Sequence, residues 1–394
     1  MNLILEKYIE AVEEDVINWR RHLHKHPELS FQEKETADYI YRELEKFEGL
    51  ELSRPTETSV MAVLKGNGPG KVMALRADID ALPINEQNDA EYKSYNEGVM
   101  HACGHDGHTA MLLGTVKVLT EAEVDFKGEV RFLFQHAEEY FPGGAVQMVE
   151  AGVMDGVDFV IGQHLMSNVE KGKFGIREGK MLAAADAFWL DVNGKGGHGG
   201  NPHETVDSIV IAAQVVSNLQ QIVSREMSPF DNVVLTIGSF VAEGAGNVIS
   251  NQVKISGTVR RYKDNEILKI PEIMERIING VTSAHGADYN FKYTEGYDPV
   301  INDKETTSKV ESVIRELYGD ESIEYVEPMT GAEDFSGYLT KAPGTFYTVG
   351  MRDESKGIVH PHHHPKFDIQ EEVLIDGVNI YANLVPGLLN GEKG

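Results

Sequence analysis

Hydrophobic positions near the start of the chain recur every three or four residues. Leu5, Val12, Val16, Trp19 and Leu23 follow this spacing, which predicts one amphipathic helix over residues 3–25, ended by a proline at position 27. After it, short apolar runs alternate with a helical pattern. We expect strands at 60–64, 72–77, 130–135 and 159–163 and a helix at 109–120. Such alternation is typical of an α/β layer with a largely parallel sheet.

Residues 181–296 follow a different order. The pattern predicts strand 187–192, helix 206–225, strands 232–240 and 253–262, helix 267–284 and strand 288–293, which is the order of a split βαβ, or ferredoxin-like, unit. The alternation of helices and strands then resumes, with helix 306–318, strand 346–349 and helix 371–389. We therefore expect a discontinuous α/β domain of residues 1–180 and 297–394, with an inserted α+β domain of residues 181–296. Residues 175–180 and 294–298 would be the hinge strands.

The overall charge excludes several classes of partner. The 394 residues contain 36 basic and 63 acidic side chains, a net charge of −27 that repels nucleic acids and anionic membrane surfaces. No apolar stretch approaches 18 residues, and the acidic N-terminal pattern is unlike a signal peptide. The single cysteine, Cys103, excludes an intramolecular disulfide. A cytoplasmic protein is expected, with neither nucleic acid nor membrane as a partner.

One short segment is rich in metal-ligand chemistry. His101, Cys103, His105 and His108 lie within eight residues. Thiolate and neutral imidazole are preferred ligands of zinc and similar divalent metals. The alternative is a buried cysteine among surface histidines at the start of a helix. Asp78, at the end of a predicted strand, is a further polar residue where sites form in α/β sheets.

Three other segments add candidate ligands. A strand is expected to end at residues 136–139, where alternation would turn Glu138 and Glu139 in different directions, one to a metal and one to its water. His164 is expected to end another strand, and residues 360–365 form a histidine-rich run. Each has an ordinary alternative, such as an acidic turn or a structural histidine. Four such segments in one α/β layer favour a metal site.

The inserted domain has a polar centre of its own. Residues 194–203 contain five glycines around His198, but they lack the Gly-Lys-Ser/Thr ending of a phosphate-binding loop. A flexible connecting loop is the alternative. Asn247 and Arg260 belong to the same domain. A guanidinium suits a substrate carboxylate, although an exposed arginine is usually only a surface charge.

Seven segments together carry a resemblance to a known family. They are residues 21–30, 75–83, 100–108, 135–139, 194–203, 331–335 and 363–367, so nearly the whole chain is covered. The sequence resembles the two-metal peptidases and amidohydrolases that include hippurate hydrolases, N-acyl-amino-acid amidohydrolases and indole-acetyl-amino-acid hydrolases. Bacterial glutamate carboxypeptidases are more distant relatives.

The resemblance implies a zinc-peptidase-like mixed sheet flanked by helices, with an inserted ferredoxin-like lid and dimerisation domain. It implies a dinuclear site whose ligands are Cys103, His105, Glu139, His164 and His363, with Glu138 as general base and Asp78 orienting a ligand. His363 is chosen because it lies two residues before Pro365, although His362 and His364 are close alternatives. His198 would reach the active site of a neighbouring subunit. Gly199 and Gly200, which follow it in this chain, depart from the small, often alanine-containing pair that is more usual at this place. Apart from the resemblance, Asn247 and Arg260 are expected to bind substrate.

The function expected from this resemblance is metal-dependent hydrolysis of the amide bond of N-acyl amino acids or short peptides. Two divalent ions are expected, zinc or manganese with cobalt open, in a homodimer or homotetramer acting on a small molecule. A broad aminopeptidase or dipeptidase on the same scaffold is an alternative, and it would need a carboxylate for the substrate's free amine. A non-catalytic metal-binding protein is a second alternative, and it would have no need of Glu138.

Overall fold

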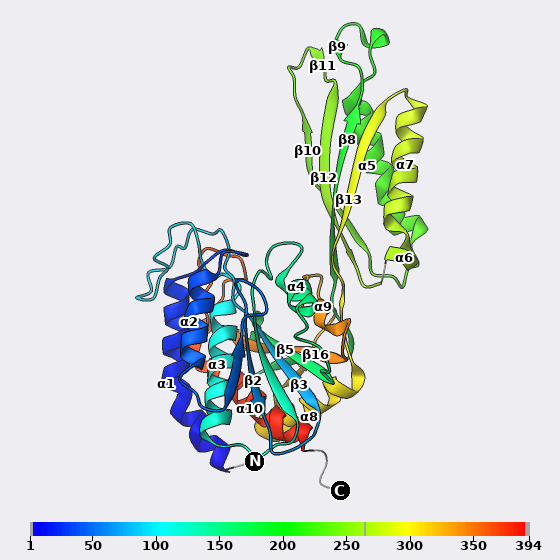
Figure 1. Ribbon diagram of the computed structural model, residues 1–394. Coiled ribbons are helices and arrows are strands. Elements are labelled where there is room, and N and C mark those ends of the chain that lie inside the picture. The colour runs from blue at the N-terminus through cyan, green and yellow to red at the C-terminus, as the bar shows by residue number, and fades with distance from the viewer. Residues whose placement is uncertain (1–2, 264, 391–394) are drawn as a thin grey trace. The chain divides into compact units, whose positions relative to one another are not determined.

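The computed structural model describes residues 3–263 and 265–390, which form two compact units (Figure 1). Unit 1 comprises the described residues of Met1–Met181, Val300–Pro328 and Asp334–Gly394. Unit 2 comprises those of Leu182–Pro299 and Met329–Glu333. Within the described ranges, no helix is both long enough and apolar enough to span a membrane.

Unit 1 contains one mixed sheet with the strand order β1-β2-β4-β3-β5-β16-β6-β15. The strands of unit 1 are β1 (Leu50–Ser53), β2 (Val60–Lys65), β3 (Val72–Asp78), β4 (Glu129–Gln135), β5 (Phe159–Glu170), β6 (Phe174–Ile176), β15 (Ile323–Tyr325) and β16 (Gly344–Arg352), together with the small pair β7 (Gly179–Leu182) and β14 (Val300–Asn302). The central strands β4, β3, β5 and β16 are parallel, whereas β1 and β2 pair antiparallel with their neighbours. Strand β6 is antiparallel to β16 and parallel to β15. The predicted parallel layer is therefore confirmed at the centre of the sheet.

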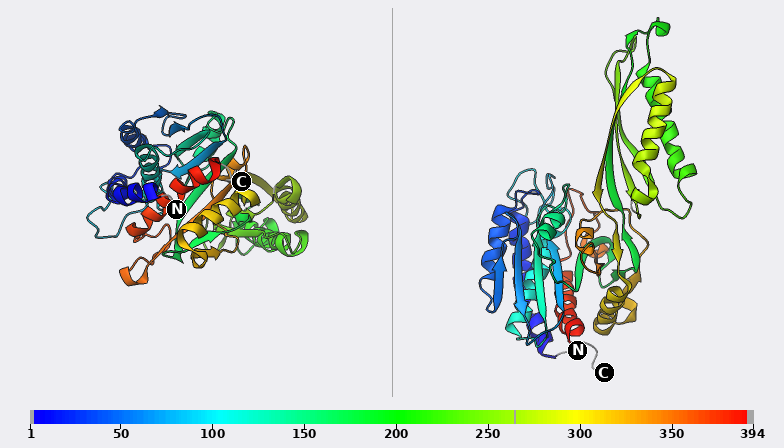
Figure 2. Two further views of the ribbon diagram at one scale, coloured as in Figure 1. Left: turned by 90° about the horizontal axis from the view of Figure 1, so that it is seen from below. Right: turned by 45° about the vertical axis from the view of Figure 1, so that its right-hand side comes forward.

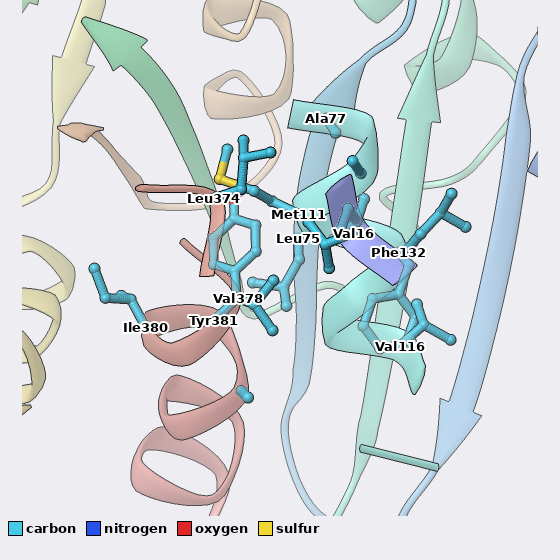
Figure 3. Packing of buried hydrophobic residues seen from close by; sticks show 14 of the residues in the cluster. Val16, Leu75, Ala77, Met111, Val116, Phe132, Leu374, Val378, Ile380 and Tyr381 are labelled. Atoms are coloured by element: carbon cyan, nitrogen blue, oxygen red, sulfur yellow. The ribbon is translucent and has the colours of Figure 1, made fainter. Parts of the chain in front are cut away.

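Helices pack on the sheet of unit 1 and build its core. They are α1 (Leu3–Lys25), α2 (Lys34–Leu44), α3 (His105–Glu121), α4 (Gly144–Glu150), α8 (Lys304–Tyr318), α9 (Ser336–Leu339) and α10 (Leu374–Leu389). Val16 of α1, Met111 of α3 and Val378 of α10 belong to one buried cluster with Leu75 of β3 (Figure 3). The three helices approach closely at Gly114, where a Cβ atom would lie 2.6 Å from Val16 and 2.9 Å from Val378.

Unit 2 is a four-stranded antiparallel sheet in the order β10-β12-β8-β13. Its elements are β8 (Ala184–Asn193), β9 (Gly197–His198), α5 (Ser208–Gln221), β10 (Val234–Ala242), β11 (Val248–Ile249), β12 (Gln252–Arg261), α6 (Asn265–Leu268), α7 (Ile270–Ala284) and β13 (Asp288–Tyr297). Helices α5 and α7 cover one face, where Phe188, Ile211 and Ile278 share a buried cluster (Figure 2). This βαββαβ order is that of a ferredoxin-like fold.

Two predicted element bounds near the polar segments are wrong. Helix α3 begins at His105 and not at residue 109, because His105 and His108 are buried inside its first turns. Strand β5 continues past His164 to Glu170, with buried Leu165, Ser167 and Val169 alternating along it. His164 is therefore in the middle of a strand and not at its end.

Candidate metal centre

Cys103 and His164 lie close together near the end of β3, where its parallel neighbour β5 continues further. Cys103 comes directly before helix α3, and Gly104 between them has a φ of 97°, a left-handed conformation that favours glycine. The turn brings the Cys103 Sγ within 3.6 Å of Nε2 of His164 on β5. The other ring nitrogen of His164, Nδ1, lies 2.6 Å from the carbonyl oxygen of Leu165 and donates to it. Nε2 of His164 therefore carries the lone pair that faces the thiol.

His105 and Glu139 present two buried ligand atoms that face each other. Nδ1 of His105 lies 3.0 Å from the carbonyl oxygen of Asp80 and 3.1 Å from its Oδ1, so that nitrogen donates and Nε2 is the nitrogen available to a metal. Nε2 of His105 lies 3.9 Å from Oε1 of Glu139. Nε2 of His105 makes no hydrogen bond within the described residues, and Oε1 of Glu139 is otherwise approached only by an imidazole nitrogen of the C-terminal loop. The buried carboxylate therefore favours a positive charge between the two atoms, either a proton on His105 or a metal cation.

His363 approaches the same carboxylate from the C-terminal loop. Its Nε2 lies 3.2 Å from Oε1 of Glu139. The backbone of His363 has a φ of 63°, which is unusual for a residue other than glycine, and its N–H donates to the carbonyl oxygen of Ala102 at 2.8 Å. The loop is thus tied to the residue before Cys103, which brings the C-terminal histidine to the segment that precedes α3.

Ligand-capable atoms of these segments form overlapping groups. Each of three groups places one atom of every member within 4.8 Å of the others, and they are Cys103 with His105 and His164, Cys103 with Glu139 and His363, and His105 with Glu138 and Glu139. The groups share Cys103, His105 and Glu139, so all five predicted ligands are brought together. Sulfur, imidazole nitrogen and carboxylate oxygen are the donor set that zinc and related divalent ions accept.

The local electrostatics also favour a cation. Burial by itself lowers the pKa of His105, but the carboxylates of Asp78, Asp80 and Glu139 outweigh burial and raise it to about 10. Burial and the nearby carboxylates raise the pKa of the Cys103 thiol well above its ordinary value. These carboxylates therefore stabilise a positive charge on any group that lies between them. A divalent cation can supply that charge and convert the thiol to a thiolate ligand.

Asp78 is fully buried and connects two basic groups. Its Oδ1 lies 2.6 Å from Nδ1 of His108, and its Oδ2 accepts from Nη1 of Arg76 at 2.7 Å. Burial raises the pKa of Asp78, but His105, His108 and Arg76 outweigh it and hold the pKa well below the ordinary value. Arg76 also donates to Asp334 at 3.0 Å. Asp78 is therefore an anion whose Oδ2 lies 3.6 Å from Nε2 of His105.

The expected arrangement of the two glutamates is wrong. Strand β4 ends at Gln135, so Glu138 and Glu139 lie in the following loop and strand alternation does not separate them. Ala137, just before them, has a φ of 50°. This turn leaves a carboxylate oxygen of Glu138 and one of Glu139 within 4.8 Å of each other and of His105. Glu138 is 6% exposed and lies beside the ligand group.

The predicted residues of unit 2 occupy opposite ends of its sheet. His198 pairs with Val248 in the two-stranded antiparallel sheet of β9 and β11, and the N–H of Gly199 donates to the carbonyl oxygen of Asn247, so His198 and Asn247 are neighbours (Figure 1). Both are exposed. Arg260 lies near the far end of β12, where its Nε donates to the carbonyl oxygen of Thr330 at 3.2 Å. The eight residue steps from position 252 to position 260 of β12 span about 27 Å.

Sequence reasoning assigned no role to several residues of the site. Asp80 accepts from His105, and His108 contacts Asp78. Asp334 accepts from Arg76 and from the N–H of Ala145 at 3.0 Å. Asp80 and His108 lie in segments 75–83 and 100–108, so their spacing from Asp78 and His105 could have identified them as residues of the site. Nothing in the hydrophobic pattern places Asp334 beside Arg76.

Comparison with known proteins agrees with this geometry. Residues 74–386 match peptidase family M20/M25/M40. The chain is 58% identical over 298 residues to an N-acyl-L-amino acid amidohydrolase of Geobacillus stearothermophilus, covering 76% of this chain and 80% of that protein. It is 40% identical over 370 residues to an N-acetylcysteine deacetylase of Bacillus subtilis, covering 94% and 95%. A crystal structure of a dinuclear metal binding peptidase of family M20 from Bacillus subtilis superposes with a TM-score of 0.83 at 36% identity, covering 97% of this chain and 99% of that one. The chain therefore belongs to peptidase family M20/M25/M40 and is a hydrolase of that family.

Proposed function

We propose that this protein hydrolyses the amide bond of N-acyl amino acids with two divalent metal ions, zinc or manganese, with cobalt also compatible. The observation that carries the proposal is the convergence of sulfur, imidazole and carboxylate ligand atoms around Cys103, His105 and Glu139, next to a second carboxylate on Glu138. Relatives named amidohydrolase and deacetylase support the same reaction class. The residues that would hold the ions are Cys103, His105, Glu139, His164 and His363.

When bound, the two ions would activate a water and polarise the amide carbonyl. Glu138 then accepts a proton from the attacking water and delivers it to the leaving amine, a transfer that contributes typically ~10²–10⁴-fold to the rate. Glu138 suits this role because it lies beside the ligand group without being one of the five proposed ligands. Asp78, an anion between Arg76 and His108, lies 3.6 Å from Nε2 of His105 and would orient that ring from the metal side. Asp80 holds Nδ1 of His105 from behind.

Unit 2 would complete the site. His198 would stabilise the negative oxygen that develops on the carbonyl, and Arg260 would pair with the substrate's free carboxylate, with Asn247 as a further polar contact. The positions of His198 and Arg260 along the sheet of unit 2 are about 27 Å or more apart, which exceeds the length of an N-acyl amino acid. If both contact one substrate, they come from two copies of the chain. We therefore propose at least a homodimer in which His198 acts in the partner's site.

The substrate class is tested with metal-loaded protein and matched substrates. N-acetyl and N-benzoyl derivatives of one set of amino acids are compared with their amides, which lack the carboxylate, and with dipeptides of the same residues. Hydrolysis of the N-acyl amino acids, lost on chelation and restored by added metal, is the expected result. Faster turnover of dipeptides would favour the dipeptidase alternative, and no turnover with two bound ions would reject the enzymatic role.

The dimer proposal is tested by mixing two inactive variants, Glu138→Ala and His198→Ala, under conditions that allow subunit exchange. If His198 acts in its partner's site, a mixed dimer has one site with both residues intact, and activity returns. If His198 acts in its own chain, every site lacks one residue and the mixture stays inactive. Cell fractionation would test the expected cytoplasmic location.

A further inference from the structure

Glu33 is a buried carboxylate that the mechanism does not use. Its side chain is 0% exposed and lies just before helix α2. Its Oε1 accepts a hydrogen bond of 2.8 Å from the N–H of Ala137, whereas its Oε2 has no partner among the described residues. Burial and the nearby Asp80 raise the pKa of Glu33 to about 7. A buried carboxylate without a cation is unfavourable for folding, so stability alone does not explain it.

The backbone that Glu33 holds is strained and leads directly to the proposed base. Ala137 has a φ of 50°, a left-handed conformation that residues with a Cβ seldom adopt. Glu33 bonds its N–H, and the N–H of Gly144 bonds its carbonyl oxygen at 3.0 Å. Both peptide groups next to Ala137 are therefore fixed. A change in the φ of Ala137 would turn the carboxylate of Glu138 away from His105.

Neighbours of Glu33 touch the same loop at two further places. We refer to residues 136–140 as the base loop. The Phe31 ring packs edge-on against the rings of His136 and Tyr140, with centroids 5.5 and 6.4 Å apart. Ser30 donates to Oδ2 of Asp80, and the same oxygen accepts from the N–H of Glu139 at 3.0 Å. Glu139 thus has a support separate from Glu33.

We propose that Glu33 is a positioning residue that keeps Ala137 in its left-handed conformation and so aims Glu138 at the reacting water. The inference rests on the proposed function, because it assigns Glu33 to the same reaction. Since Asp80 holds Glu139 independently, loss of the Glu33 contact should reduce proton transfer while leaving the metal in place. A loss of rate with the metal still bound would distinguish Glu33 from a residue that only maintains the fold.

The test compares two variants that separate the charge of the Glu33 side chain from its length. Glu33→Asp keeps the charge but shortens the side chain by about 1.5 Å, so it loses the bond to Ala137. Glu33→Gln removes the charge but keeps an acceptor oxygen at the same reach. We expect kcat of Glu33→Asp to fall by roughly 10–100-fold with KM and bound metal unchanged, and Glu33→Gln to retain most activity. The matched control is Glu28→Asp: within the described residues the Glu28 carboxylate accepts hydrogen bonds only from Thr36, so this variant should keep wild-type kcat.

Amide hydrogen exchange provides a readout that does not depend on activity. The Ala137 amide should exchange faster in Glu33→Asp than in wild type, Glu33→Gln or the Glu28→Asp control. Equal exchange in all four proteins would overturn the inference, as would a Glu33→Gln variant less active than Glu33→Asp, or a loss of metal that accounts for the loss of rate. If wild type hydrolyses no N-acyl amino acid, the proposed function fails, and unchanged Ala137 exchange would separately reject the contact.

Discussion

Replacing Glu33 by glutamine should change the pH dependence of stability. The pKa of Glu33 is raised from the ordinary 4.5 to about 7 in the folded protein, so the folded state holds this proton more tightly than the unfolded state. The contribution of Glu33 is therefore favourable below about pH 4.5 and is lost as the pH rises to 7. The difference between the two pKa values corresponds to a loss of roughly 3 kcal/mol. Glutamine is neutral throughout and avoids this loss.

The assay is urea unfolding of the metal-free proteins at pH 5 and pH 8, because removing metal separates this effect from the pH dependence of metal binding. Wild type and Glu33→Gln should have similar free energies of unfolding at pH 5. At pH 8 the variant should be more stable by about 3 kcal/mol. Glu28→Gln controls for the loss of one negative charge from the same segment. A difference that is equal at the two pH values, or a less stable variant at pH 8, would show that Glu33 is not an unpaired buried acid.

Three further changes test the metal centre. Glu138→Gln should keep both ions while kcat falls by ~10²–10⁴-fold, whereas Glu139→Ala should lose metal, as measured by elemental analysis after dialysis. Cys103→Ala should weaken metal binding, and chelation of wild type should abolish hydrolysis until metal is returned; full activity of metal-free protein would contradict this role. His363→Ala should lower metal content, while His362→Ala should leave it nearly unchanged but lower the melting temperature, and the reverse result would exchange the two assignments.

Periodicity predicted those parts of the fold that bury one face against one layer. The pattern predicts the helix over residues 3–25 because Leu5, Val12, Val16, Trp19 and Leu23 are all buried, and the elements of unit 2 follow from the same pattern. The start of α3 was missed because His105 and His108 look like surface residues but are buried by contacts with Asp80 and Asp78. Those contacts come from the end of β3 and the residues just after it, which are distant in the sequence, so the local pattern around α3 does not predict them.

The base loop is a second place where the local sequence pattern did not predict the structure. A pair of glutamates after a strand suggests alternation, but the left-handed turn at Ala137 directs both carboxylates toward His105. The turn depends on Glu33, which lies among Gln32, Lys34 and other polar residues and has the local pattern of a solvated surface. Its burial is decided by the packing of a segment more than a hundred residues away.

The three adjacent histidines before Pro365 have the same chemistry, so only their surroundings can distinguish them. Nδ1 of His362 lies 3.0 Å from the Ser167 hydroxyl and its Nε2 lies 2.9 Å from the carbonyl oxygen of Leu165. Because burial lowers the pKa of His362 to about 4, its ring is neutral, and one donor and one acceptor satisfy it completely. Nδ1 of His364 accepts from the Lys366 N–H. Only His363 directs Nε2 to Glu139, and its left-handed backbone is what turns that ring away from its two neighbours. A histidine ligand is thus selected by the ring nitrogen that the rest of the fold leaves available.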